Sequence, residues 1–242
     1  MLSEIIKVFD GGDGSGHYEH VGIPNHKGGS ARSGKYRNYQ NNKYSKKHIV
    51  YSKSDNRIDK IKNRIPKATK AEIKNYNNAL EKYTEFEYNE IKQSYRNKYS
   101  GKEYDKYYEK VSNYLDDFIY RSEKFEGTIY RGLNLDKETA LNIINKLKKG
   151  KTMDMQGISS WSSNREISKD FSENADDSNG NYCLLFNLKN KSGVSVKDLS
   201  TFSYEDEVLH PTTARYVLRN NEFKKQKLSN GKILIEINLK EV

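Results

Sequence analysis

Two hydrophobic periodicities divide this 242-residue chain into a helical part and a strand-forming part. Between residues 67 and 119, apolar side chains recur every three or four residues, which is the spacing of one face of a helix. After residue 127 the pattern changes to short runs of β-branched and aromatic residues. Because helices precede strands in blocks and do not alternate with them one for one, the order predicts an α+β fold.

Local signals refine this prediction. Thr69 is followed by Glu72 three residues later, which matches a capping box at the start of a helix. The helical spacing is interrupted near Thr84, so we expect a break there. We expect helices over 67–83, 88–96, 107–119, 136–149 and 163–171, and strands over 127–133, 157–163, 182–188, 194–196, 207–209, 215–218 and 232–239.

Composition limits the class of protein. The net charge of +10 would suit an anionic partner, but lysine is spread along the whole chain and forms no dense basic block. The single cysteine, Cys183, excludes an internal disulfide and is expected to be a packing residue. The apolar run at residues 5–9 is too short for a signal peptide, and no run approaches membrane-spanning length. We therefore expect a soluble protein.

The beginning of the chain has a different character. Residues 11–34 contain half of the 16 glycines, together with His17, His20 and His26, and show no periodicity. We interpret them as a flexible arm, in preference to a metal site. With the polar residues 35–65, which we expect to be loose or weakly helical, they form an expected arm over 1–65 before a catalytic domain over 66–242.

Two strands carry polar residues that suit a binding cleft. Arg131 lies within an apolar run, where it would be paired with an internal acid or would receive an anion such as a pyrophosphate. Ser160 and Ser162 alternate with Trp161, so both hydroxyls would project from one face of the strand and Trp161 from the other. A serine-rich strand is also common at the edge of a sheet.

Glu205 and Glu207 stand two apart, directly before the apolar residues Val208 and Leu209. In an extended chain both carboxylates would project to the same side. Such a pair suits oxocarbenium chemistry, because one carboxylate can stabilise developing positive charge while the other takes a proton from the nucleophile. Taken alone, an acidic pair at the start of a strand is more often solvated surface.

The three features in order, Arg131, Ser160-Trp161-Ser162 and Glu205-x-Glu207, resemble the Arg / Ser-Thr-Ser / Glu-x-Glu signature of mono-ADP-ribosyltransferases of the bacterial-exotoxin type. The resemblance covers roughly residues 66–242. It implies two packed β-sheets that form a cleft for NAD, with helices on the N-terminal side. NAD would be a substrate, and no metal would be needed.

The resemblance also implies roles for individual residues. Glu207 would hydrogen-bond the nicotinamide ribose and stabilise its oxocarbenium ion, Ser160 would position Glu207, and Glu205 would orient and deprotonate an acceptor arginine. The remaining implied roles are NAD phosphate binding or cleft support for Arg131, a backbone contact with the nicotinamide amide for Gly132, bracing for Ser162, and acceptor stacking for Phe202. Trp161 departs from the signature, and Arg165 is the one arginine that follows the serine strand closely enough to be a second phosphate ligand.

We therefore predict an NAD-dependent protein-arginine ADP-ribosyltransferase with NAD glycohydrolase activity on the side. Its partner would be a host protein that carries the acceptor arginine, with no membrane involved. Residues 14–30 are similar to short segments of phage virion proteins, which would place the chain in a bacterial host cytoplasm or a phage particle. Two alternatives stay open: a basic virion or nucleic-acid-binding module without activity, and a hydrolase that uses the carboxylate pair on another substrate.

Overall fold

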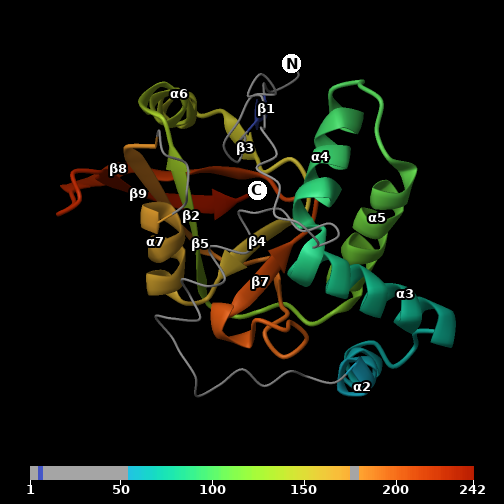
Figure 1. The fold of residues 1–242 in the computed structure, drawn as a ribbon. Coiled ribbons are helices and arrows are strands. Elements are labelled where there is room, and N and C mark those ends of the chain that lie inside the picture. The colour runs from blue at the N-terminus through green and yellow to red at the C-terminus, as the bar shows by residue number, and fades with distance from the viewer. Residues whose placement is uncertain (1–4, 8–53, 175–179) are drawn as a thin grey trace, which may run out of the picture.

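The computed structural model describes residues 5–7, 54–174 and 180–242, and the helices that precede residue 122 gather on one side of the strands (Figure 1). The helices of this layer are α2 (Ser54–Arg64), α3 (Lys70–Glu81), the π-helix η1 (Lys82–Phe86), α4 (Tyr88–Tyr99) and α5 (Lys106–Arg121). The predicted capping box is confirmed, since the Thr69 hydroxyl accepts from the Glu72 amide at 3.2 Å and the Glu72 carboxylate accepts from the Thr69 amide at 2.6 Å. The predicted break near Thr84 is the π-helix.

Helix α2 lies before the boundary expected at residue 66, yet it packs with the rest of the helical layer. Ile61 and Ile65 are buried in one apolar cluster with residues of α3, α4 and α5. The same cluster includes Ile158, Val194 and Leu209, which lie in or beside the strands. We therefore propose that the catalytic domain begins at or before Ser54, because α2 contributes to its core.

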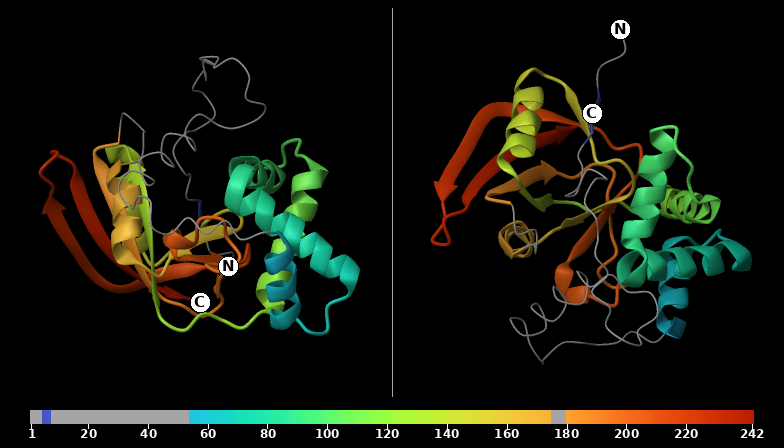
Figure 2. Two further views of the ribbon diagram at one scale, coloured as in Figure 1. Left: turned by 60° about the horizontal axis from the view of Figure 1, so that its bottom comes forward. Right: turned by 45° about the horizontal axis from the view of Figure 1, so that its top comes forward.

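Nine strands form one hydrogen-bonded order in the described part of the chain, β1-β3-β8-β9-β5-β2-β4-β7-β6. Their bounds are β1 (Ile5–Lys7), β2 (Thr128–Leu135), β3 (Thr152–Asp154), β4 (Ser159–Ser162), β5 (Tyr182–Lys189), β6 (Val194–Ser195), β7 (Glu207–His210), β8 (Tyr216–Lys227) and β9 (Ile233–Glu241). We expected two packed sheets. The order is instead continuous, but β2 and β4 share a single residue pair, Tyr130 with Ser162. Because strands in a long sheet twist, β4 and β7 run obliquely to β8 and β9 while this pair keeps the order unbroken (Figures 1 and 2).

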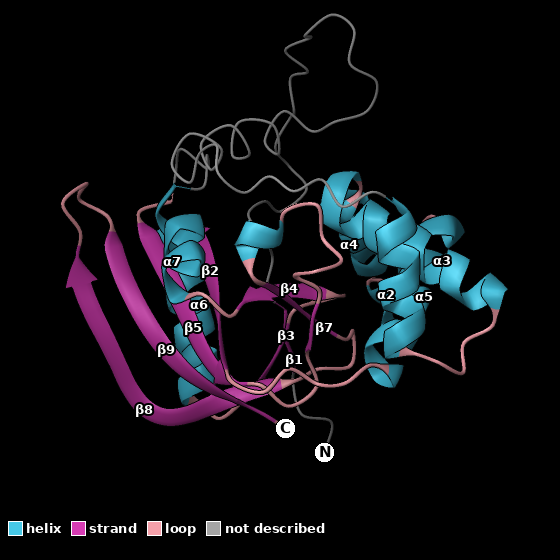
Figure 3. Cartoon of the chain, turned by 90° about the horizontal axis from the view of Figure 1, so that it is seen from below, coloured by secondary structure: helices cyan, strands magenta, loops and turns pink. Residues whose placement is uncertain are grey.

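Helices α6 (Lys137–Lys148) and α7 (Arg165–Asn174) pack on the strands away from the helical layer (Figure 3). Buried residues of α6 share an apolar cluster with β2, β5 and β9, and this cluster also holds Trp161. Helix α7 approaches β2 most closely at Gly132, where an added Cβ would lie 1.9 Å from the Ser168 carbonyl oxygen. Only glycine fits at that crossing.

The α+β class and each expected helix and strand are confirmed, with shifts of a few residues at most ends, while the strand expected over 215–218 extends to Lys227. Trp161 is buried, and Cys183 is buried in the core, as expected for a packing residue. Burial raises the pKa of the Cys183 thiol to about 11, so this residue acts in packing. The short strands β1 and β3 were not predicted. None of the described helices is long and apolar enough to cross a membrane.

Candidate active site

Three neighbouring strands bring the polar residues singled out in the sequence to one place. In the order β2-β4-β7, Arg131 lies on the first strand, Ser160 and Ser162 on the second, and Glu207 on the third. Ser162 stands opposite Glu207 in the antiparallel register of β4 and β7. Strands β4 and β7 are thus paired directly at two of the residues expected to form the site.

Glu207 is the most enclosed acid of the site, with 7% of its surface exposed. Burial raises the pKa of its carboxyl from the ordinary 4.5 to about 7. A hydrogen bond with Ser160 and the nearby charge of Arg131 act in the opposite direction and favour the ionised form. Glu207 therefore changes its protonation state near neutral pH, which is the range in which a carboxylate is most useful for catalysis.

Glu205 does not lie in the strand, and our argument from strand alternation was wrong. Residues Ser203–Glu205 form a 3-10 turn, and β7 begins only at Glu207. Asp206 between them adopts the left-handed conformation, with φ 49° and ψ 42°. Because this backbone reverses direction at Asp206, the period-two rule does not relate the two carboxylates. Glu205 is half-buried on the turn.

The turn at 203–206, which we call the acceptor turn, is tied to the end of the serine strand. The Ser162 hydroxyl donates to the Glu205 carbonyl oxygen at 2.7 Å and accepts from the Asn164 amide at 3.0 Å. The amide of Ser163 donates to the Asp206 carbonyl at 3.0 Å. An ion pair with Lys197 holds the Asp206 carboxylate. These contacts fix the backbone on both sides of Glu205.

Arg131 is almost fully enclosed, at 8% exposure, and its Nη1 donates to the Ser160 carbonyl at 2.5 Å. Its positive charge favours the ionised form of Glu207 and disfavours protonation of the buried His210. The guanidinium thus contacts the backbone of β4 at Ser160 and also places a positive charge near Glu207.

Tyr83 is a site residue that the sequence reasoning missed, since it was assigned to the apolar face of a helix. It lies on the π-helix, is buried, and donates from its hydroxyl to the Ile158 carbonyl at 2.9 Å. The Ser160 hydroxyl lies 3.2 Å from the Tyr83 oxygen. Burial and then the neighbouring charge of Glu207 hold the pKa of Tyr83 well above its usual range. The expected helix break was the available signal, because π-helices often mark functional sites.

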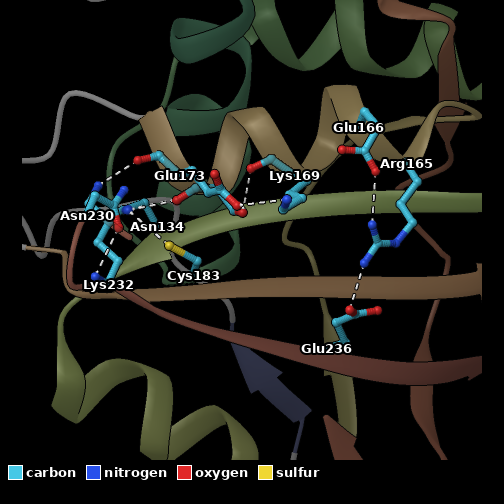
Figure 4. A network of polar contacts seen from close by, with 10 residues as sticks. Asn134, Arg165, Glu166, Lys169, Glu173, Cys183, Asn230, Lys232 and Glu236 are labelled. Carbon is cyan, nitrogen blue, oxygen red and sulfur yellow. Dashed lines mark hydrogen bonds and ion pairs between the residues drawn. The ribbon is translucent and has the colours of Figure 1, made fainter. Parts of the chain in front are cut away.

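Arg165 lies at the start of α7 and forms ion pairs with acidic residues outside the serine strand (Figure 4). Its guanidinium contacts Glu236 of β9 at 2.7 Å and Glu166 at 3.0 Å. In the same network, Asn134 donates to the Ser172 carbonyl at 2.8 Å and Lys232 donates to the Glu173 carbonyl at 2.7 Å (Figure 4). The network attaches α7 to the sheet at both of its ends.

The remaining expected residues have defined places. Phe202 directly precedes the acceptor turn, is half-buried, and lies edge-on to Tyr204 with 6.0 Å between ring centroids. Gly132 pairs with Leu185 of β5. His17, His20 and His26 lie outside the described residues. Within the described ranges, no group of three or more histidine, cysteine or acidic side chains is arranged to hold a metal ion.

A family model described as NAD:arginine ADP-ribosyltransferase matches residues 37–241 of the chain. The chain belongs to this family. Its enzymes take NAD as a substrate, in agreement with the expected use of NAD. A search among curated proteins found no match.

Solved structures of bacterial enzymes share the fold. The Vis toxin, an ADP-ribosyltransferase from Vibrio splendidus, superposes with a TM-score of 0.54 at 22% identity, over 78% of this chain and 82% of that one. Vis in complex with agmatine gives a TM-score of 0.55 at 21% identity, over 79% and 86% of the two chains. The ADP-ribosyltransferase HopU1 of Pseudomonas syringae gives 0.56 at 19% identity, over 78% and 87%. The expected ADP-ribosyltransferase fold is confirmed.

Proposed function

We propose that this protein transfers a single ADP-ribose from NAD to an arginine side chain of a host protein and releases nicotinamide. The observation that carries the proposal is the position of Glu207. It is a nearly enclosed carboxylate that titrates near neutral pH, and it lies beside Ser160 and within the field of Arg131. Because the chain belongs to the NAD:arginine ADP-ribosyltransferase family, NAD is the substrate that the site would bind.

In the proposed reaction, the bond between ribose C1′ and the nicotinamide nitrogen breaks, and its electron pair leaves with nicotinamide. Ionised Glu207 hydrogen-bonds the ribose 2′-hydroxyl and stabilises the positive charge that develops at C1′. Ser160 orients Glu207, and Arg131 supports the strand that carries Ser160. The backbone of Gly132 would contact the nicotinamide amide.

Glu205 would act on the acceptor. A guanidinium must lose a proton as its nitrogen bonds to C1′, and the Glu205 carboxylate on the acceptor turn would take that proton. Phe202 would pack against the acceptor, and Ser162 would brace the turn through its contact with the Glu205 carbonyl. Without an acceptor, water would attack C1′ and give NAD glycohydrolase activity.

The proposal is tested with agmatine, the small guanidino compound found in the complex with Vis. Incubation of the protein with NAD and agmatine should give ADP-ribosyl-agmatine, detected by mass spectrometry. Glu205→Gln should abolish this product and keep part of the NAD hydrolysis. Hydrolysis without any guanidine adduct from the wild type would exclude arginine as the acceptor. The phage setting remains a prediction, because it depends on residues 14–30, outside the described residues.

A further inference from the structure

Helix α2 contacts the segment that leads into the acceptor turn through one basic face. Arg57, Lys60 and Arg64 are spaced three and four residues apart, so they lie on the same side of the helix. All three reach residues 195–201, which we call the lead segment. Arg64 donates to the Ser195 carbonyl at 2.6 Å, Lys60 donates to the Asp198 carbonyl at 2.7 Å, and Arg57 donates to the Thr201 hydroxyl at 3.3 Å.

Arg57 forms the enclosed end of this contact. It is 3% exposed, and its Nη2 pairs with the Glu85 carboxylate at 2.8 Å. Glu85 lies on the π-helix and also accepts a hydrogen bond from the Thr201 hydroxyl. Arg57, Glu85 and Thr201 thus join α2, the π-helix and the last residue before Phe202. A buried cluster of charge-assisted hydrogen bonds holds its side chains in place more firmly than an exposed ion pair does.

The lead segment transmits its position to the acceptor turn. Its residue Val196 is buried, and its amide donates to the Glu207 carbonyl at 2.9 Å. Lys197 pairs with Asp206, the residue between the two glutamates. Leu199 is buried in the same apolar cluster as Ile61 of α2. A shift of the lead segment therefore moves the backbone that carries Phe202 and Glu205.

We propose that α2 is a positioning element for the acceptor step, and that Arg57, Lys60 and Arg64 set the placement of Phe202 and Glu205 relative to the NAD ribose. The inference rests on the proposed function. It adds that α2 determines how well an acceptor guanidinium is positioned for transfer. Glu207 bonds the Val196 amide of the lead segment through its backbone carbonyl, but it has two further anchors, its pairing with β4 and its contact with Ser160. Loss of the α2 contacts should therefore weaken transfer far more than NAD cleavage.

The test compares two activities in the full chain: NAD hydrolysis without acceptor, and transfer to agmatine. For Arg57→Gln, kcat/KM for agmatine should fall about 10- to 100-fold, since small misplacements of reacting groups have effects of this size. Hydrolysis should stay within about threefold. Lys62→Gln is the matched control, because Lys62 is an exposed residue of the same helix. An equal fall in both activities, or no fall in transfer, would overturn the inference.

A second set of variants avoids the buried cluster. Arg64 and Asp198 form a more exposed ion pair. Arg64→Glu should lower the ratio of transfer to hydrolysis several-fold, and the double variant Arg64→Glu with Asp198→Arg should restore it. Failure of the reversed pair to restore the ratio would contradict a positioning role. A wild type without either activity would instead refute the proposed function, and so the two failures are distinguishable.

Discussion

The hydroxyl of Ser162 donates a 2.7 Å hydrogen bond to the carbonyl oxygen of Glu205. Ser162 also stands opposite Glu207 in the register of β4 and β7. One residue of the serine strand therefore contacts both parts of the Glu-x-Glu motif, Glu207 through backbone pairing and Glu205 through the Ser162 hydroxyl. This relationship explains how a turn that ends in a left-handed residue, Asp206, keeps a defined position next to β7.

Replacement of Ser162 tests this attachment. Ser162→Ala removes the donor to Glu205 and the acceptor for the Asn164 amide, so the free energy of unfolding should fall by about 1–2 kcal/mol. Transfer to agmatine should fall more than NAD hydrolysis, because the turn carries Glu205. Ser163→Ala is the control, since that hydroxyl makes only a 3.4 Å contact with the Asp206 carbonyl. Identical urea denaturation curves for both variants would contradict the account.

The raised pKa of Glu207 predicts the pH dependence of NAD cleavage. Only ionised Glu207 can stabilise the oxocarbenium ion, and its pKa lies at about 7 in the folded protein. Because kcat/KM reports groups of the free enzyme, kcat/KM for NAD should rise with pH and level off above this value. Initial rates of nicotinamide release in a series of buffers measure the profile. A profile that is already level at about pH 5, where an ordinary glutamate is ionised, would contradict the prediction.

The raised pKa of Glu207 also predicts that its ionisation above neutral pH lowers the free energy of unfolding. A carboxyl whose pKa rises on folding contributes stability at low pH that is lost as pH rises from 4.5, its ordinary value, through about 7. Glu207→Gln cannot ionise, so above neutral pH it should be more stable than the wild type by on the order of 3 kcal/mol. The difference should vanish near pH 4. Denaturant unfolding at both pH values measures it, and a variant less stable at high pH would refute the burial argument.

Tyr83 should matter for NAD cleavage although it lies on a helix. Tyr83→Phe removes the hydroxyl that donates to the Ile158 carbonyl and lies beside Ser160. The buried Ile158 carbonyl would lose its hydrogen-bond donor, which should lower the free energy of unfolding by about 1–3 kcal/mol. Ser160, which hydrogen-bonds Glu207, would lose its contact with the Tyr83 oxygen. We expect NAD hydrolysis to fall about tenfold, which corresponds to roughly 1.4 kcal/mol. Tyr120→Phe, at an 83% exposed position, should change neither activity nor stability.

The sequence predicted those features that depend on local pattern. Periodicity identified the helices that follow residue 66, and the capping box at Thr69 marked a helix start. The strand order brings Arg131, Ser160 and Glu207, which the sequence singled out, onto three neighbouring strands.

The missed features depend on tertiary contacts or on unusual backbone. Asp206 has a positive φ without being glycine, so nothing in the sequence indicated that Glu205 lies on a turn and does not share a strand face with Glu207. Tyr83 looked like any aromatic residue on an apolar helix face. Arg57 contacts Thr201 from 144 positions away, in a part of the chain that we expected to be loose or weakly helical. No local periodicity carries information of that kind.

The most direct test of the central claim measures nicotinamide release from NAD by the wild type and by Glu207→Ala, with and without agmatine. The account predicts release by the wild type that increases with agmatine, and loss of release in a Glu207→Ala variant that remains folded by circular dichroism. Release by Glu207→Ala at the wild-type rate would contradict the role of Glu207 in cleaving NAD.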